Sequence, residues 1–261
     1  MHRGSQAALA LLRRTARASA ARMGRQEQAQ ELAGRVREVF DPAQRRELRD
    51  EHALHVALCA ILRETSSAID IGANQGAVLE SILRVAPHGR HMAFEPIPDL
   101  NEALVSRFPG VDVRQVALSD SSGSAEFSHV LDAPAYSGLR ERSDLPEGVG
   151  GVRRLQVRTE RLDEALPEGY VPTLLKIDVE GAELQVLQGA TETLERHRPF
   201  ILFEHGAGGA DLYGAHPNQL FDLLDGVGMR IFDLDGSGPY SRERFEQTFT
   251  EPIWNFLAAP R

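Results

Sequence analysis

The stretch that decides the fold is Ile69-Asp70-Ile71-Gly72-Ala73-Asn74-Gln75-Gly76. The residues from 66 to Ile69 suit a short buried strand, and the apolar residues that follow Gly76 recur at helical spacing until Pro87. Glycine permits a sharp turn and lets a ligand lie against the backbone. A strand that ends in an acid and turns through two glycines into a helix is therefore typical of a nucleotide site.

The charge of this loop distinguishes between two kinds of cofactor. A dinucleotide site uses G-x-G-x-x-G, so that the N–H groups of a helix meet a pyrophosphate. Here the pattern is Gly72-x-Asn74-x-Gly76 after Asp70, and a carboxylate at that position would repel a pyrophosphate. It suits the ammonium end of an amino acid instead. S-adenosylmethionine has an ammonium, a cationic sulfonium and no phosphate, so the loop favours it over NAD.

A second acid follows the next predicted strand. Residues 90–94 are expected to be extended, and they end in Glu95-Pro96. Glu95 is about 23 residues beyond Gly72, close to the ~20 expected for a carboxylate that binds ribose hydroxyls. We therefore predict that Glu95 binds the ribose, the alternative being a solvated strand end.

Composition excludes several classes of protein. The 261 residues are 42% hydrophobic and 26% charged, as in ordinary globular proteins, and the net charge of −9 argues against nucleic-acid or anionic-membrane partners. The single Cys59 allows no intrachain disulfide and no cysteine-rich zinc site, so a cytoplasmic location is expected. The longest strictly apolar run, residues 7–12, is too short to span a bilayer.

The N-terminal stretch differs from the rest. Six arginines precede the first acid: Arg3, Arg13, Arg14, Arg17, Arg22 and Arg25. An organellar transit peptide has this character, but we favour a helical or disordered extension. Residues 31–63 are expected to be helical, with an apolar face. This helix would pack on the catalytic domain, cover the cofactor or form a homo-oligomer contact. We predict an N-terminal helical extension over 1–63 and a cofactor-binding domain over 64–261.

From residue 66 on, strands and helices alternate, which predicts a parallel sheet flanked by helices. The expected strands are 66–71, 90–95, 111–118, 174–177, 200–205, 229–234 and 253–258. The expected helices are 77–86, 98–107, a single helix through residues 184–194 and one that begins at 217. Residues 124–130 alternate like a β-ribbon, and 132–151 are expected to be a long loop. A further extended piece is expected over 152–159, followed by a helical turn over 162–166. The segment 235–250 is expected to be a polar excursion.

Ionisable residues recur where the predicted strands end. They are Asp70, Glu95, Asp178 and the pair Glu204-His205. In an open parallel α/β sheet, ligands bind outside the carboxyl ends of the strands. We therefore expect these side chains to converge on one crevice.

These residues also carry a resemblance. The chain resembles the FkbM family of S-adenosylmethionine-dependent methyltransferases over roughly residues 65–260. The matching motifs are Asp70-Ile71-Gly72-Ala73-Asn74-Gln75-Gly76, Phe94-Glu95-Pro96, Val116-Ala117-Leu118-Ser119-Asp120, Leu175-Lys176-Ile177-Asp178-Val179-Glu180-Gly181-Ala182-Glu183 and the strand ending in Glu204. The Lys-Ile-Asp-Val-Glu-Gly block is the most specific of them.

The resemblance implies a fold and an activity. The fold is Rossmann-like, class I, with a seven-stranded, mostly parallel sheet whose last strand is antiparallel. The activity is O-methylation of a small-molecule hydroxyl, often on a sugar or polyketide of a specialised metabolite such as an antibiotic. By position, the residues expected at the cofactor are Asp70, Gly72, Ala73, Asn74, Gly76, Glu95, Ala117, Leu118, Ser137 and Asp178.

Methyl transfer to a hydroxyl needs an aligned nucleophile, excluded water and either a general base or a Lewis-acid metal. The candidates for either role are Asp178, Glu180, Glu204 and His205. The ordinary pKa of histidine near 6.5 suits His205 to base chemistry, although a loop histidine without a role is the alternative. Asp178 and Glu204 are the candidate ligands for Mg²⁺, which prefers oxygen. Lys176 is expected to form a structural ion pair.

Two other functions stay open. A Rossmann-type oxidoreductase is opposed by the missing G-x-G-x-x-G and by Asp70, and an inactive S-adenosylmethionine-binding scaffold is opposed by the acids at four strand ends. The sequence does not name the acceptor. Its specificity is expected to reside in residues 132–151, 206–216 and 235–250.

Overall fold

The computed structural model describes residues 42–142, 145, 148–251 and 253–261. The chain divides into two units, Met1–His52 and Ala53–Arg261, and the division falls inside helix α3 (Pro42–Ile61). Most of the predicted extension, including the six arginines that precede the first acid, lies outside the described residues. The predicted boundary between residues 63 and 64 stays a prediction.

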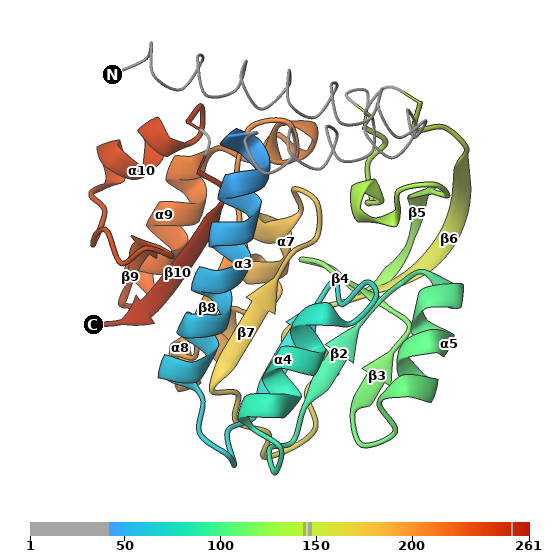
Figure 1. Ribbon diagram of the computed structural model, residues 1–261, viewed down its shortest axis with the longest axis horizontal. Helices are drawn as coiled ribbons and strands as arrows, with labels where there is room; N and C mark the ends of the chain where they lie inside the picture. Colours follow the sequence, from blue (N-terminus) through green and yellow to red (C-terminus); the bar gives the residue numbers. More distant parts are fainter. Residues whose placement is uncertain (1–41, 143–144, 146–147, 252) are drawn as a thin grey trace, which may run out of the picture. The chain divides into compact units, whose positions relative to one another are not determined.

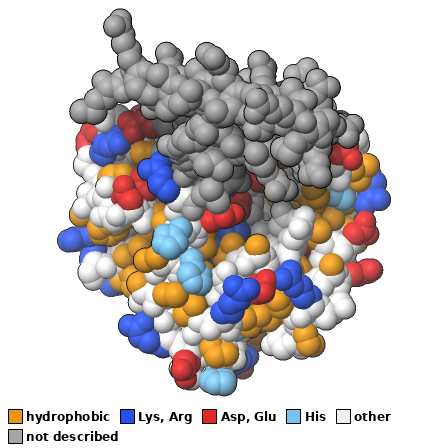
Figure 2. Space-filling view, viewed as in Figure 1, with side chains coloured by type: hydrophobic (Ala, Val, Ile, Leu, Met, Phe, Trp, Pro, Cys, Tyr) orange, Lys and Arg blue, Asp and Glu red, His pale blue; other side chains and the backbone are white. Residues whose placement is uncertain are grey.

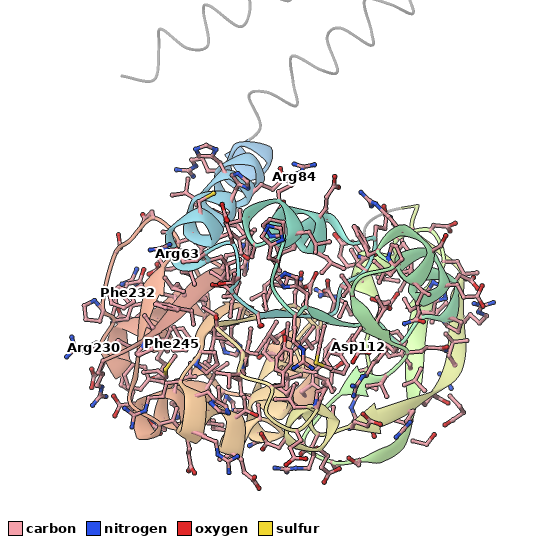
Figure 3. The ribbon with its side chains drawn as sticks, turned by 90° about the horizontal axis from the view of Figure 1, so that it is seen from below. Arg63, Arg84, Asp112, Arg230, Phe232 and Phe245 are labelled. Carbon is pink, nitrogen blue, oxygen red and sulfur yellow. The ribbon has the colours of Figure 1, made fainter. Side chains whose placement is uncertain are left out.

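The second unit is built on a seven-stranded sheet with the order β3-β2-β1-β7-β8-β10-β9 (Figure 1). The strands are β1 (Ala68–Ile71), β2 (Met92–Phe94), β3 (Asp112–Arg114), β7 (Leu174–Ile177), β8 (Phe200–Glu204), β9 (Met229–Asp233) and β10 (Asn255–Pro260). β10 is antiparallel to both its neighbours, and the other pairings are parallel. This confirms the predicted Rossmann-like, class I sheet with an antiparallel last strand. Figure 3 shows Asp112 of β3 toward one end of the sheet, and Arg230 and Phe232 of β9 toward the other.

Both faces of the sheet are buried. Successive strand residues point to opposite sides, and helices pack against the apolar side chains on each face. On one face, Ala68, Leu174 and Leu202 pack with residues of α3 and α4 (Ala77–Val85), such as Leu58 and Ile82. On the other face, the isoleucines and Phe203 pack with residues of four helices. These helices are α7 (Glu183–Gln188), α8 (Thr191–His197), α9 (Pro217–Gly226) and α10 (Arg242–Thr248). α5 (Pro98–Arg107) follows β2.

A second, three-stranded sheet corrects one prediction. The expected strand 111–118 is two strands, because after Arg114 the chain leaves the main sheet and Ala117 pairs with Thr159. The second sheet has the order β4-β6-β5, formed by β4 (Ala117–Leu118), β5 (Gly123–Val130) and β6 (Val152–Glu160). The extended segments predicted at 124–130 and 152–159 are thus present, and the structure adds that they pair with each other as the antiparallel β5–β6 ribbon.

Three helical predictions also need correction. The single helix expected through 184–194 is α7 and α8, separated at Gly189, where a Cβ would lie 2.0 Å from the carbonyl oxygen of Ser119. The polar excursion 235–250 contains α10, which is capped by the Ser241 hydroxyl and buries Phe245. Short helices also lie in two predicted loops, as η1 (Pro134–Tyr136) and η2 (Ala210–Tyr213). The helical turn predicted over 162–166 is present as α6 (Leu162–Ala165).

The surface shows no segregation of charge in the view of Figure 2, where acidic and basic side chains of the described residues are interspersed with apolar ones. Within the described ranges, no helix is both long enough and apolar enough to cross a membrane.

Gly72 allows β1 to end directly against the end of β7. Its φ is 76°, and a Cβ there would lie 1.9 Å from the carbonyl oxygen of Asp178. We predict that Gly72→Ala lowers the free energy of unfolding by roughly 2 kcal/mol or more, measured by urea unfolding. The matched control is Gly226→Ala at the end of α9, where a Cβ meets nothing within 4 Å. Wild-type stability in Gly72→Ala would contradict this account of the turn.

Candidate functional site

The glycine loop, residues 72–76, lies across the carboxyl ends of β1 and β2. The N–H groups of Gly72 and Ala73 donate to the carbonyl of Phe94 at 3.0 and 3.1 Å. Asn74 and Gly76 have positive φ values of 47° and 81°, which direct the chain into α4. The buried side-chain oxygen of Asn74 has no hydrogen-bond partner among the described residues.

Glu95 joins the end of β2 to this loop. It is 4% exposed, and its two oxygens accept hydrogen bonds from the N–H groups of Asn74 (2.8 Å) and Ile97 (2.9 Å). Burial raises the pKa of Glu95 above its ordinary value, although the two hydrogen bonds act to lower it. Because each carboxylate oxygen has two lone pairs, Glu95 retains capacity to accept further hydrogen bonds.

Lys176 lies between two of the predicted acids. It pairs with Asp70 across β1 and β7, and its Nζ lies 3.6 Å from Asp70 Oδ1 and 3.1 Å from Asp178 Oδ2. Burial alone lowers the pKa of Lys176, but the charges of Asp178 and Asp70 raise it above its ordinary value. Neither oxygen of Asp70, which is 1% exposed, has a hydrogen bond in the geometry of the described residues. Burial raises the pKa of Asp70, and Lys176 opposes that rise.

Four carboxylates lie at or just beyond the ends of β7 and β8. They are Asp178, Glu180, Glu183 and Glu204, and we call them the carboxylate cluster. Ile177 pairs with Phe203, which places Asp178 beside Glu204 at the ends of adjacent strands. Burial, followed by the charge of Asp178, raises the pKa of Glu204 well above its ordinary value and that of Glu180 to about 8. Burial also raises the pKa of Glu183 to about 7. Since negative charge is already unfavourable here, the cluster is suited to accept or share protons near neutral pH.

The structure does not bring His205 to the carboxylate cluster. His205 directly follows β8, on the side of the sheet that Phe203 faces, and its ring lies 5.9 Å from that of Phe245 and 5.3 Å from that of Phe249. Phe245, labelled in Figure 3, belongs to α10. Burial lowers the pKa of His205 to about 4, so the ring is neutral at pH 7. The placement gives its predicted catalytic role no support.

Three further residues expected at the cofactor lie toward the second sheet. Ala117 packs in a cluster with Ile97, two residues after Glu95, and Leu118 beside it is 2% exposed. Ser137 is tied to the ribbon, because its Oγ accepts a hydrogen bond from the N–H of Val130 at 2.9 Å. Their roles at the cofactor stay predictions.

The geometry also gives the Mg²⁺ prediction for Asp178 and Glu204 no support. Over the part of the chain that the structure describes, no group of three or more His, Cys, Asp or Glu side chains is arranged to hold a metal ion.

Two residues of the site were missed by the sequence reasoning. Arg142 Nη1 bonds to Glu180 Oε2 at 3.0 Å, but its loop carried no signal beyond its length. Glu183 stands in the quoted Lys-Ile-Asp-Val-Glu-Gly-Ala-Glu motif without an assigned role, although the same motif was its available signal.

The seven-stranded sheet, the glycine loop and the acids at the strand ends together define a Rossmann-like, class I methyltransferase fold. The sequence matches the family model of the methyltransferase FkbM domain over residues 70–227, more than half of the chain. The chain belongs to this family, and the resemblance seen in its motifs is confirmed.

Three curated relatives are similar over parts of the chain. Methyltransferase sdnD of Sordaria araneosa is 32% identical over 48% of this chain and 60% of its own length. Hexuronic acid methyltransferase AglP of Haloferax volcanii is 32% identical over 62% of this chain and 65% of its own length. 2-O-methyltransferase NoeI of Sinorhizobium fredii is 27% identical over 58% of this chain and 68% of its own length. The chain thus spans less than two thirds of sdnD and AglP.

We predict that Lys176→Met destabilises the protein by about 3–5 kcal/mol at pH 7, because it leaves Asp70 buried without a cation. The pKa of Asp70 in the folded variant then lies further above its ordinary value of 3.8. The loss relative to wild type should therefore shrink as the pH falls toward that value, since the folded variant takes up a proton. Urea unfolding at pH 5 and pH 8 measures this.

The double variant Asp70→Asn/Lys176→Met is the control. It should recover part of the lost stability at pH 8 and lose most of the pH dependence. An equal loss at both pH values in the single and double variants would show that the ion pair is not the cause.

Proposed function

We propose that the chain is an S-adenosylmethionine-dependent O-methyltransferase whose acceptor is a hydroxyl of a small molecule, a sugar or polyketide moiety of a specialised metabolite. The observation that carries this proposal is the row of acids at one edge of the sheet. These acids are close enough to interact: the charge of Asp70 contributes to the raised pKa of Glu95, and the charge of Asp178 contributes to the raised pKa values of Asp70 and Glu204. The names of AglP and NoeI support a sugar-like acceptor and transfer to oxygen.

The residues at the glycine loop fit a cationic cofactor. Asn74 presents a buried oxygen without a hydrogen-bond partner in the described chain, and such an acceptor suits an ammonium group. Asp70, which already faces Lys176, adds a buried negative charge beside this loop. Glu95 has spare lone pairs for ribose hydroxyls, and Ala117 and Leu118 offer an apolar surface to the adenine. When bound, S-adenosylmethionine supplies a methyl group that its sulfonium activates. Gly72, Ala73, Gly76 and Ser137 complete the proposed cofactor site.

The carboxylate cluster supplies the general base of the proposed reaction. A sugar hydroxyl is a poor nucleophile, so a carboxylate that accepts its proton as the carbon–oxygen bond forms lowers the barrier. Asp178 and Glu204 are the two candidates, because they stand side by side at the strand ends. The side chain of Asp178 is 37% exposed, so it is accessible to an acceptor. We assign no step to His205, whose ring is enclosed by phenylalanines.

Calorimetric titration tests the cofactor. We expect micromolar binding of S-adenosylhomocysteine and none of NADH. Glu95→Ala should weaken the former by about tenfold or more, because it loses charge-assisted bonds to the ribose. Glu102→Ala, an exposed glutamate on α5, is the matched control and should bind like wild type. Binding of NADH alone would favour an oxidoreductase, and binding without methyl transfer to any acceptor would favour a scaffold.

Substitution at Glu204 tests the base. With labelled S-adenosylmethionine and a panel of glycosides and polyketide alcohols, Glu204→Gln should lower kcat by about a hundredfold or more. Its affinity for S-adenosylhomocysteine should stay within about threefold of wild type, because Glu204 is not assigned to the cofactor. Glu195→Gln, an exposed residue of α8, serves as the control. Full activity in both Glu204→Gln and Asp178→Asn would place the base elsewhere.

A further inference from the structure

The turn that follows β7, residues 178–181, has a strained backbone. Glu180 has a φ of 58° and Gly181 a φ of 108°. A non-glycine residue in the left-handed region persists only where its surroundings hold it. A Cβ on Gly181 would lie 2.2 Å from the carbonyl carbon of Gly209, so the turn is also confined by the chain that follows β8.

The carboxylate of Glu183 holds this turn from inside. Glu183 is 1% exposed, and its Oε1 accepts hydrogen bonds from the N–H groups of Gly181 at 3.0 Å and Val179 at 3.3 Å. The two donors flank Glu180. One buried oxygen therefore satisfies two backbone groups and fixes the chain on both sides of the strained residue.

Glu180, in its left-handed conformation, reaches Arg142 of the long loop. The ion pair is 3.0 Å long, and the two side chains are only 14% (Arg142) and 22% (Glu180) exposed. The guanidinium also lies 5.4 Å from the ring centre of Tyr136. Two residues before it, the N–H of Arg140 donates to the hydroxyl of Tyr213 at 3.1 Å.

These contacts place residues 134–142 beside the carboxylate cluster. An ideal Cβ on Gly138 would lie 3.0 Å from the Tyr213 hydroxyl and 3.8 Å from the Cβ of Glu180, so the two segments are close along their length. Gly138 also pairs with Ser128 of the ribbon. The segment thus connects the second sheet to the edge of the main sheet.

We propose that Glu183 is a positioning residue of the site. Through the turn 178–181, it directs Asp178 and Glu180 and thereby holds residues 134–142 beside the carboxylates, where they form the acceptor side of the site. The assignment of residues 134–142 to the acceptor side rests on the proposed function, whereas the order of contacts from Glu183 to Glu180 to Arg142 does not.

Hydrogen–deuterium exchange on the full chain tests this order through peptides that cover 134–142 and 178–182. In Glu183→Ala, both peptides should exchange about tenfold or more faster, because two buried N–H groups lose their acceptor. Glu183→Gln keeps an oxygen acceptor and should restore most of the protection. Glu195→Gln on the exposed side of α8 should match wild type. If Glu183→Ala does not fold, Glu183→Asp, which shortens the reach, should show the same two regional increases.

Arg142→Ala tests the direction of the effect. It should speed exchange in 134–142 and leave 178–182 at the wild-type rate, because the turn is held by Glu183 and not by the loop. Faster exchange in 178–182 would overturn the proposed order. An unchanged 134–142 peptide in Glu183→Ala, or an even increase over the whole domain, would overturn the positioning role.

Titration of the wild type with S-adenosylhomocysteine separates the two proposals. Binding together with unchanged exchange in Glu183→Ala would reject the positioning role and leave the proposed function. Absence of binding together with the two regional increases would reject the proposed cofactor and support the positioning role.

Discussion

The buried ammonium of Lys176 is the interaction on which the site depends. It stands between Asp70 of the strand that leads into the glycine loop and Asp178 of the turn that follows β7. Without this cation, the buried carboxylate of Asp70 and the nearby, partly exposed carboxylate of Asp178 would repel each other. With one cation between them, β1 and β7 can each end in an acid while their backbones approach closely at Gly72. The proposed cofactor half and the proposed acceptor half of the edge therefore share one counter-ion.

The order of elements and the acids at their ends could be predicted from the sequence, because both are local signals. Alternating apolar strands and helices identified the main sheet, and Asp70, Glu95, Asp178 and Glu204 lie where strand ends were expected. The pairing of β4 could not be predicted. The run from Val116 to Leu118 is as apolar as a continuation of β3 would be, and only its partner, β6, shows that it left the main sheet.

The direction of side chains is the second feature that could not be predicted from the sequence. Glu204 is the last residue of β8 and His205 follows it directly, but consecutive extended residues face opposite ways. Phe245 of α10 and Phe249 just after it, whose rings lie near His205, come from a segment expected to be polar. Arg142 likewise comes from a loop with no periodic pattern, and its partner Glu180 is 38 residues away in the sequence. Contacts between distant segments of this kind depend on tertiary packing, which a single sequence does not encode locally.

The ribbon has a further consequence for how such proteins diversify. β4 and β6 pair at Ala117 and Thr159, so the chain that departs after β4 returns to the point it left. The segment between β4 and β6, which includes residues 134–142, therefore begins and ends at two strands that pair with each other. Such a segment can lengthen, shorten or be exchanged between homologues without shifting the register of the main sheet or the glycine loop. The fold thereby separates the main sheet and the glycine loop from a segment whose length can change independently of both.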